Sequence, residues 1–162
     1  MPPHLFPTRH DLPADNRRDL VALLNAHVAD LTDLRSQTKS AHWNVKGPTF
    51  IALHELFDDL AGKLDGLTDT VAERATALGG VAEGTVRQAA ERSRLPEFPS
   101  RTFAGLSVVE ALAVRFAHLG KSTREAIDAA ETLGDAATAD LFTAAARELD
   151  QALWFLEAHL QA

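Results

Sequence analysis

At 162 residues, the chain is long enough for one well-filled core but too short for two comfortable domains. Its net charge of −7 argues against wrapping nucleic acid around the protein body, and the absence of cysteine excludes disulfides and thiolate metal sites. Apolar residues, 46% of the chain, recur in short periodic groups rather than membrane-spanning runs, and the N-terminus carries no secretory signal, so we expect a cytoplasmic protein without membrane association.

Residues 1–15 predict an extended N-terminal arm, because they hold four of the seven prolines and show little periodicity. Asp15 and Asn16 are both good N-cap residues, so a first helix is predicted to begin there. It continues to about residue 41 with a leucine-rich stripe on one face. Residues 16–162 are therefore expected to form one helical domain.

A second helix is predicted from about residue 48 to about residue 78. Pro48 suits a helix start, because its missing N–H is not needed there. A glycine pair at 79–80 marks the C-terminal end. Gly62 and Gly66 weaken the middle of this helix without ending it.

The connector, at about 81–106, contains a short helical segment at 85–92 and then a break at two prolines. A third helix fits residues 107–131, and a fourth runs from after residues 134–135 to the end. No segment shows the alternation of a strand. The predicted fold is all-α: a four-helix bundle with a short helix in the connector between its second and third helices.

Two pairs of metal-ligand residues lie on the second predicted helix. His54 and Asp58 are four residues apart, as are Asp69 and Glu73. At about 100° per residue, the four side chains fall within an arc of about 100°, so both pairs share one face of the helix. Asp65 lies on the same face and is expected near a dimer axis.

The two pairs cannot hold one ion within a single molecule. Fifteen residues separate His54 from Asp69, and at about 1.5 Å per residue this is about 22 Å along the helix. Metal–ligand bonds are only about 2 Å long. A second copy lying antiparallel across a two-fold axis would place its Asp69 and Glu73 opposite His54 and Asp58. The spacing therefore predicts a metal site shared between two subunits.

Three segments resemble the Dps family, the bacterial mini-ferritins: His-Trp-Asn-Val-Lys-Gly-Pro at 42–48, Phe-Ile-Ala-Leu-His-Glu at 50–55 and Asp-Thr-Val-Ala-Glu-Arg at 69–74. The resemblance covers essentially the whole chain from about residue 15. It includes the spacing His-x11-His-x3-Asp-x10-Asp-x3-Glu. It implies a ferritin-like bundle that assembles from two-fold dimers into a dodecameric hollow shell.

The resemblance also implies an activity. Members of this family are ferroxidases that oxidise Fe(II), preferentially with hydrogen peroxide, at the two-fold interface and store ferric mineral inside the shell, which protects against oxidative damage. Carried over to this chain, the iron ligands of a mono-iron or di-iron centre are His42, His54 and Asp58 from one subunit with Asp69 and Glu73 from its partner. The same ligand types also accept zinc or manganese.

Three further residues receive roles from the resemblance. Trp43, beside a ligand, would have a catalytic role in supplying or intercepting an electron; the alternative is an aromatic residue that fills the bundle. Glu55 and Asp59 would face the shell cavity and nucleate mineral; the alternative is a solvated helix surface.

Acidic residues around the turn before the last helix would line the three-fold pores. Three copies of each would draw Fe(II) inward by focusing negative potential. The alternative for these residues is helix capping at the surface. They are Glu131, Asp135 and Asp140.

DNA binding is the alternative function, that of a nucleoid-packing protein whose metal site is secondary. Many members of the family bind DNA through a lysine-rich tail. The arm of this chain has no lysine, and the last predicted helix runs to the C-terminal end. Arg9, Arg17 and Arg18 are offset by Asp11 and Asp15. We therefore expect DNA binding, through multivalent arms, to be weak.

Overall fold

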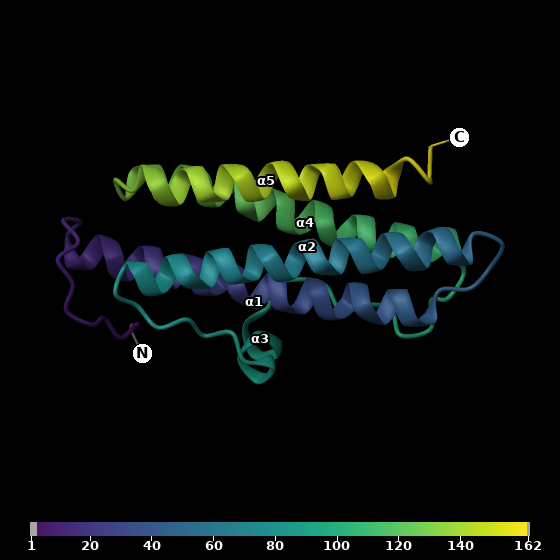
Figure 1. Ribbon diagram of the computed structural model, residues 1–162, viewed down its shortest axis with the longest axis horizontal. Coiled ribbons are helices and arrows are strands. Elements are labelled where there is room, and N and C mark those ends of the chain that lie inside the picture. The colour runs from purple at the N-terminus through teal and green to yellow at the C-terminus, as the bar shows by residue number, and fades with distance from the viewer. Residues whose placement is uncertain (1–2, 162) are drawn as a thin grey trace.

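The computed structural model describes residues 3–161 and consists of four long helices and one short one (Figure 1). Their bounds are α1 (Ala14–Asn44), α2 (Phe50–Ala77), α3 (Val86–Arg92), α4 (Gly105–Thr132) and α5 (Ala136–Glu157). The predicted all-α four-helix bundle, with a short helix in its connector, is confirmed. Within residues 3–161, no helix combines the length and the apolarity that crossing a bilayer requires.

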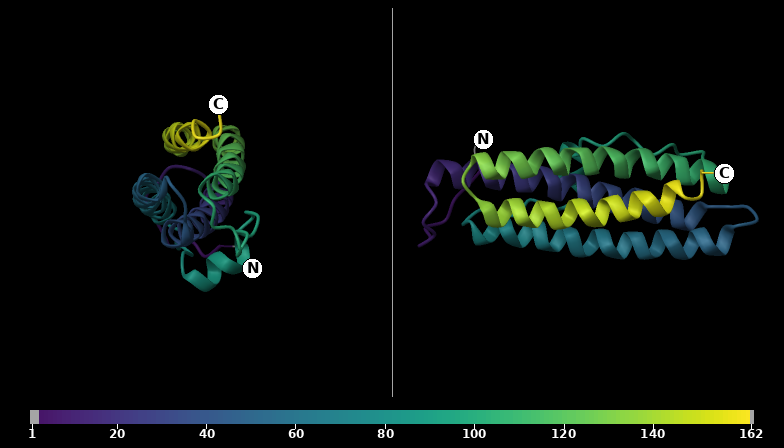
Figure 2. Two further views of the ribbon diagram at one scale, coloured as in Figure 1. Left: turned by 90° about the vertical axis from the view of Figure 1, so that its right-hand side faces the viewer. Right: turned by 90° about the horizontal axis from the view of Figure 1, so that it is seen from above.

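The long helices form two antiparallel pairs, α1 with α2 and α4 with α5, which pack together into the bundle (Figure 2). The connector between α2 and α4 passes along the length of the bundle, so α2 and α4 run in the same direction (Figure 1). One such long crossover is typical of ferritin-like bundles. The short helix α3 lies outside the bundle, against α1.

The core is built from one apolar stripe on each long helix. Its largest fully buried side chains include Phe57 from α2, Phe116 from α4 and Phe142 from α5, surrounded by leucines from α1, α2 and α4. Apolar residues recurring every three to four positions align on one face of a helix, so burying that face removes most of the leucine surface from water. The opposite face of α2 is left for polar side chains, including the predicted ligands.

The start of α1 differs from the prediction. The helix begins at Ala14 with Pro13 in the N-cap position, so neither Asp15 nor Asn16 caps it. Asp15 lies in the first turn and accepts a hydrogen bond from Arg18, at 2.6 Å. The side chain of Asn16 instead donates to the carbonyl oxygen of Leu133. A contact within α1 thus decides the role of Asp15, and a tertiary contact decides that of Asn16.

The start of α2 is two residues later than predicted. Thr49 is its N-cap, and Pro48 lies in the turn before the helix, after Gly47 with a φ of 123°. Backbone hydrogen bonds to the end of the connector, where α4 begins, hold this turn in place. The backbone N–H of Lys46 donates to the carbonyl of Phe103, and that of Gly105 donates to the carbonyl of Lys46. The link fixes the junction of α1 and α2 against the start of α4.

The arm at residues 3–13 has no regular secondary structure, and it is tied to the end of α2. The N–H of Phe6 donates to the carbonyl of Gly79, at 2.7 Å. A Cβ on Gly79, whose φ is 86°, would come within 2.9 Å of the Phe6 carbonyl oxygen, so only glycine fits this contact. Arg17 joins the two segments by donating to the carbonyls of Leu12 and Leu78.

His27 is buried in the bundle. Its Nδ1 lies 3.0 Å from the carbonyl oxygen of Leu23, and its ring packs against Phe142. Its Nε2 is buried without a hydrogen-bond partner. Burial lowers the pKa of His27, so the ring is neutral in the folded chain near pH 7. It lies within the core and contributes nothing to the predicted metal site.

Candidate metal centre

The end of α1 and the start of α2 bring His42 and His54 into direct contact. Their imidazole rings are stacked, with centroids 3.7 Å apart and planes 19° from parallel. His42 is buried and His54 is half-buried. Because the two helices are antiparallel and joined by a short turn, residues twelve apart in the sequence become neighbours across the helix pair. The fold itself therefore assembles the first two predicted ligands.

Each histidine is oriented by the backbone of the other. Nδ1 of His42 lies 2.7 Å from the carbonyl oxygen of His54, and Nδ1 of His54 lies 2.9 Å from the carbonyl oxygen of His42. A carbonyl oxygen can only accept, so each neutral ring carries its proton on Nδ1. Nε2 of each ring then keeps its lone pair. This is the arrangement in which metal-binding histidines are commonly held.

Asp58 lies one turn of α2 after His54 and is the third predicted ligand of this half. Its Oδ1 is 2.6 Å from Nζ of Lys39 on α1. The hydrogen bond and the charge of Lys39 lower the pKa of Asp58, so its carboxylate is ionised, as a metal ligand must be. The lysine holds the carboxylate in place, and a metal ion would have to compete with it.

An open cleft of about 620 Å³ lies beside these residues. It is lined by the three predicted ligands of the first half together with the two acids predicted to nucleate mineral. Its lining consists of His42, Ile51, His54, Glu55, Asp58 and Asp59. Both nucleation candidates are exposed, and Asp59 also pairs with Lys63 at 3.3 Å. Their nucleating role stays a prediction.

The other two predicted ligands, Asp69 and Glu73, are exposed further along α2. The fold does not bring them to His54. Within residues 3–161, no group of three or more histidine and acidic side chains is arranged to hold a metal ion. A single chain thus presents two separate halves, about 22 Å apart along a continuous helix. Their meeting across a subunit interface stays a prediction.

Trp43 points away from the bundle interior. It is 64% exposed although it directly follows the buried His42, so within the chain it does not fill the core. That alternative interpretation is wrong. Its redox role is untested by the geometry of one chain.

Asp135, one of the predicted pore residues, has a structural role within the chain. It is 4% exposed, caps α5 by accepting from the N–H of Thr138, and forms an ion pair with Arg74 at 2.7 Å. Burial alone would raise the pKa of its carboxyl, but hydrogen bonds from Thr138 and Arg74 outweigh burial and hold that pKa below its ordinary value. Glu131 and Asp140 are exposed near the same turn, and their pore role stays a prediction.

Lys39 and Arg74 are the site neighbours that the sequence did not reveal. Lys39 lies three residues before His42, one turn along α1, and this spacing places it on the face that meets α2. Arg74 follows Glu73 but faces the turn before α5. Their partners lie 19 and 61 residues away, so no local pattern marks the ion pairs.

Comparison with known proteins identifies the family of this chain. The model of the ferritin-like domain family matches residues 21–162. A protein of Agrobacterium fabrum named DNA protection during starvation protein is 43% identical over 154 residues, which cover 95% of each chain. The chain belongs to the Dps branch of the ferritin-like family.

Solved Dps structures share the whole fold. DpsA14 from Streptomyces coelicolor superposes with a TM-score of 0.93 at 32% identity, covering 100% of this chain and 96% of that one. A Dps of Mycobacterium smegmatis gives a TM-score of 0.90 at 30% identity, covering 100% of this chain and 96% of that one. The α3 connector and the N-terminal arm are therefore included in the likeness to these Dps chains.

Replacing Lys39 by methionine is expected to raise the affinity of the assembled protein for Zn(II) or Co(II) several-fold. The change removes a cation and frees Asp58 while keeping the length and packing of the side chain. Isothermal titration with the metal alone measures the effect. Lys63→Met, which removes a lysine from the neighbouring pair with Asp59, is the matched control and is expected to change the affinity far less. Equal or weaker binding by Lys39→Met would contradict the competition between lysine and metal.

Proposed function

We propose that this chain forms a ferroxidase that stores iron. Fe(II), the substrate, binds between two subunits, is oxidised there, and is deposited as ferric mineral within a dodecameric shell. The observation that carries the proposal is the reciprocal fixing of His42 and His54, which leaves both Nε2 atoms available beside the ionised Asp58.

Asp69 and Glu73 of a second subunit would complete the site. Carboxylates are hard ligands that favour Fe(III) over Fe(II), so they would promote oxidation and then bind the product. Two histidines and three carboxylates would leave coordination positions open for the oxidant. The same ligands would accept Zn(II) or Mn(II), which would then compete with the substrate.

Hydrogen peroxide is the proposed preferred oxidant. Two Fe(II) ions give one electron each, the O–O bond breaks, and two protons complete two molecules of water. Trp43, exposed next to His42, is proposed to donate or intercept an electron if only one Fe(II) is present. Consuming both Fe(II) and peroxide removes the reactants that would otherwise produce hydroxyl radicals.

Entry and storage would use the remaining acids. Glu131 and Asp140 are proposed to attract Fe(II) at the pores, whereas the charge of Asp135 is already matched by Arg74. Glu55 and Asp59, in the same cleft as the histidines, are proposed to receive ferric ions as mineral begins to form.

A second candidate function is protection of DNA by direct binding, because the similar protein of Agrobacterium fabrum is named for protecting DNA. The net charge of −7 and the contact between Phe6 and Gly79, which ties the arm to α2, weigh against it. We propose that protection is mainly indirect, through removal of Fe(II) and peroxide.

The ferroxidase proposal is tested by loading the protein anaerobically with Fe(II) and adding peroxide. We expect rapid ferric absorbance that stays with the protein on size separation. Asp69→Ala/Glu73→Ala is expected to lower the initial rate at least tenfold, because each site loses its partner half. Asp128→Ala/Thr132→Ala, a pair with the same spacing on the exposed surface of α4, is the control and should match the wild type. Equal rates for the wild type and the Asp69/Glu73 variant would refute the proposed site.

The DNA alternative is tested by a gel shift near neutral pH at increasing salt. We expect no retardation of duplex DNA at about 0.15 M salt, where phosphate contacts by a few arginines are screened. Retardation that persists at this salt concentration and is lost in Arg9→Ala/Arg18→Ala would instead establish direct DNA binding.

A further inference from the structure

Two glycines in the middle of α2 have no explanation within one chain. Gly62 and Gly66 are both exposed, and a Cβ added to either would meet nothing within 4 Å. Neither has a positive φ. Glycine weakens a helix relative to alanine, because it leaves the unfolded backbone freer. Each of the two glycines therefore lowers the stability of the helix, and no side chain of this chain fills the space beside either of them.

The position of this gap relates it to the metal ligands. The mean of positions 54, 58, 69 and 73 falls between residues 63 and 64, so the two-fold axis of the proposed site would pass α2 there. At about 1.5 Å per residue, Gly62 and Gly66 lie within about 4 Å of that point along the helix. Gly62 falls inside the arc of the four ligands, and Gly66 lies about 20° beyond it.

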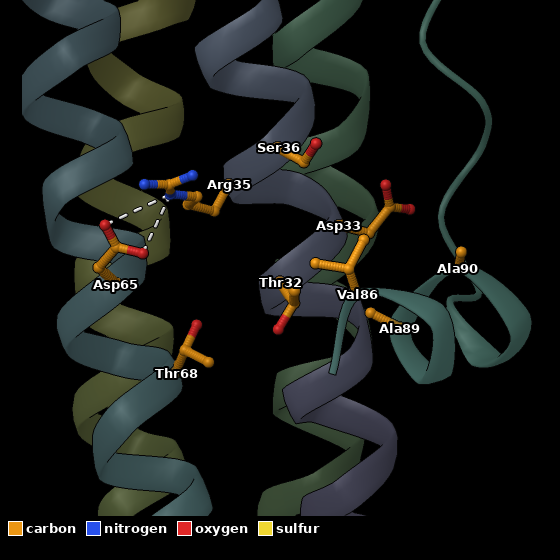
Figure 3. Close-up of a pocket in the computed structure, with 9 residues that line it drawn as sticks. All are labelled: Thr32, Asp33, Arg35, Ser36, Asp65, Thr68, Val86, Ala89 and Ala90. Carbon is orange, nitrogen blue, oxygen red and sulfur yellow. Dashed lines mark hydrogen bonds and ion pairs between the residues drawn. The ribbon is translucent and has the colours of Figure 1, made fainter. Parts of the chain in front are cut away.

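The surroundings of Asp65 also suit a symmetric contact with a second copy. Asp65 lies next to the same point on α2, so the axis would bring two copies of its carboxylate close together. Nε of Arg35 on α1 lies 3.1 Å from Oδ1 of Asp65 and holds the carboxylate toward α1 (Figure 3). This ion pair offsets the repulsion that two unpaired carboxylates would produce at the axis.

A cleft of about 280 Å³ adjoins this ion pair, between α1, α2 and α3 (Figure 3). Val86 of α3 lines it and is 79% exposed. Most of the residues that line the cleft are polar, and Val86, Ala89 and Ala90 of α3 form an apolar side next to the Arg35–Asp65 pair. The spacing of the predicted metal ligands along α2 calls for a second copy of this chain at this surface, rather than for a small molecule.

We propose that Gly62 and Gly66 are positioning residues that set the distance between the two halves of the metal site. This inference rests on the proposed function, since it assumes that the site is shared between subunits. The separation of two packed helices depends on the side chains at their crossing. Metal–ligand distances tolerate only about 0.2 Å. Side chains at 62 and 66 would push the α2 helices apart, and the four ligands could no longer meet at one ion.

The test replaces both glycines, first by alanine and then by leucine, in the full chain. Because both changes favour the helix, thermal unfolding is expected at the wild-type temperature or above it. The affinity for Zn(II), titrated alone, is expected to fall about tenfold for the alanine pair and further for the leucine pair. Gly120→Ala on α4 is the matched control, since its Cβ would meet only ordinary contacts of 3.6 Å and longer. It should leave the Zn(II) affinity unchanged.

The Zn(II) affinity decides the outcome. Wild-type affinity in both double variants would overturn the proposal, whether or not the assembly changes in sedimentation. Lower affinity with an intact helix would support it, and the alanine pair provides this result if the leucine pair does not fold. The proposed function fails separately: a wild type that binds Zn(II) through Asp69 and Glu73 but does not oxidise Fe(II) would leave the spacing role intact.

Discussion

The reach of a metal–ligand bond is the constraint on which the proposed shared site of this protein depends. Such a bond is about 2 Å long, whereas His54 and Asp69 are about 22 Å apart on one continuous helix. Neither rotation of side chains nor bending of α2 can close that gap. A chain with this ligand order therefore either leaves both pairs incomplete or completes them with a second copy. The exposed polar face of α2 is the surface on which such completion would occur.

The half that one chain can build is already rigid. Each histidine holds the other through a backbone carbonyl, and the turn between α1 and α2 is fixed to the start of α4 by the Lys46 backbone. Lys39 forms an ion pair with the carboxylate of Asp58. The histidine rings therefore already have the orientation in which a metal ion would bind. The ion would have to compete only with Lys39, for the carboxylate of Asp58. This division would suit the proposed site, which takes up Fe(II) and later releases ferric product to a mineral.

Much of the fold follows from the sequence because helical periodicity and glycine or proline at the ends are local signals. The short helix after Thr85, with its capping box to Gln88, is one example. The sequence was less informative where the partner of a polar side chain decides its role. Asp15 resembles a cap but pairs with Arg18, one turn further into the helix, and Pro13 takes the cap position. The sequence likewise gives no sign that Asp135, a predicted pore residue, pairs with Arg74, 61 residues earlier.

The candidate site, like the fold, could be predicted only in part from the sequence. The face shared by His54, Asp58, Asp69 and Glu73 follows from helix geometry alone, whereas the stacking of His42 on His54 needed the tertiary structure. The cost of glycine at positions 62 and 66 is visible in the sequence, but only the structure shows that nothing in the chain fills the space beside them.

Subunit mixing tests the shared site most directly. His54→Ala/Asp58→Ala and Asp69→Ala/Glu73→Ala chains are each expected to be inactive alone, because every site in either assembly lacks one half. If the two are unfolded together and reassembled in equal amounts, half of the random dimers contain both chains. Each of these mixed dimers has one complete site, so about a quarter of the wild-type ferroxidase rate should return. No recovery in assemblies shown to contain both chains would contradict a site shared between subunits.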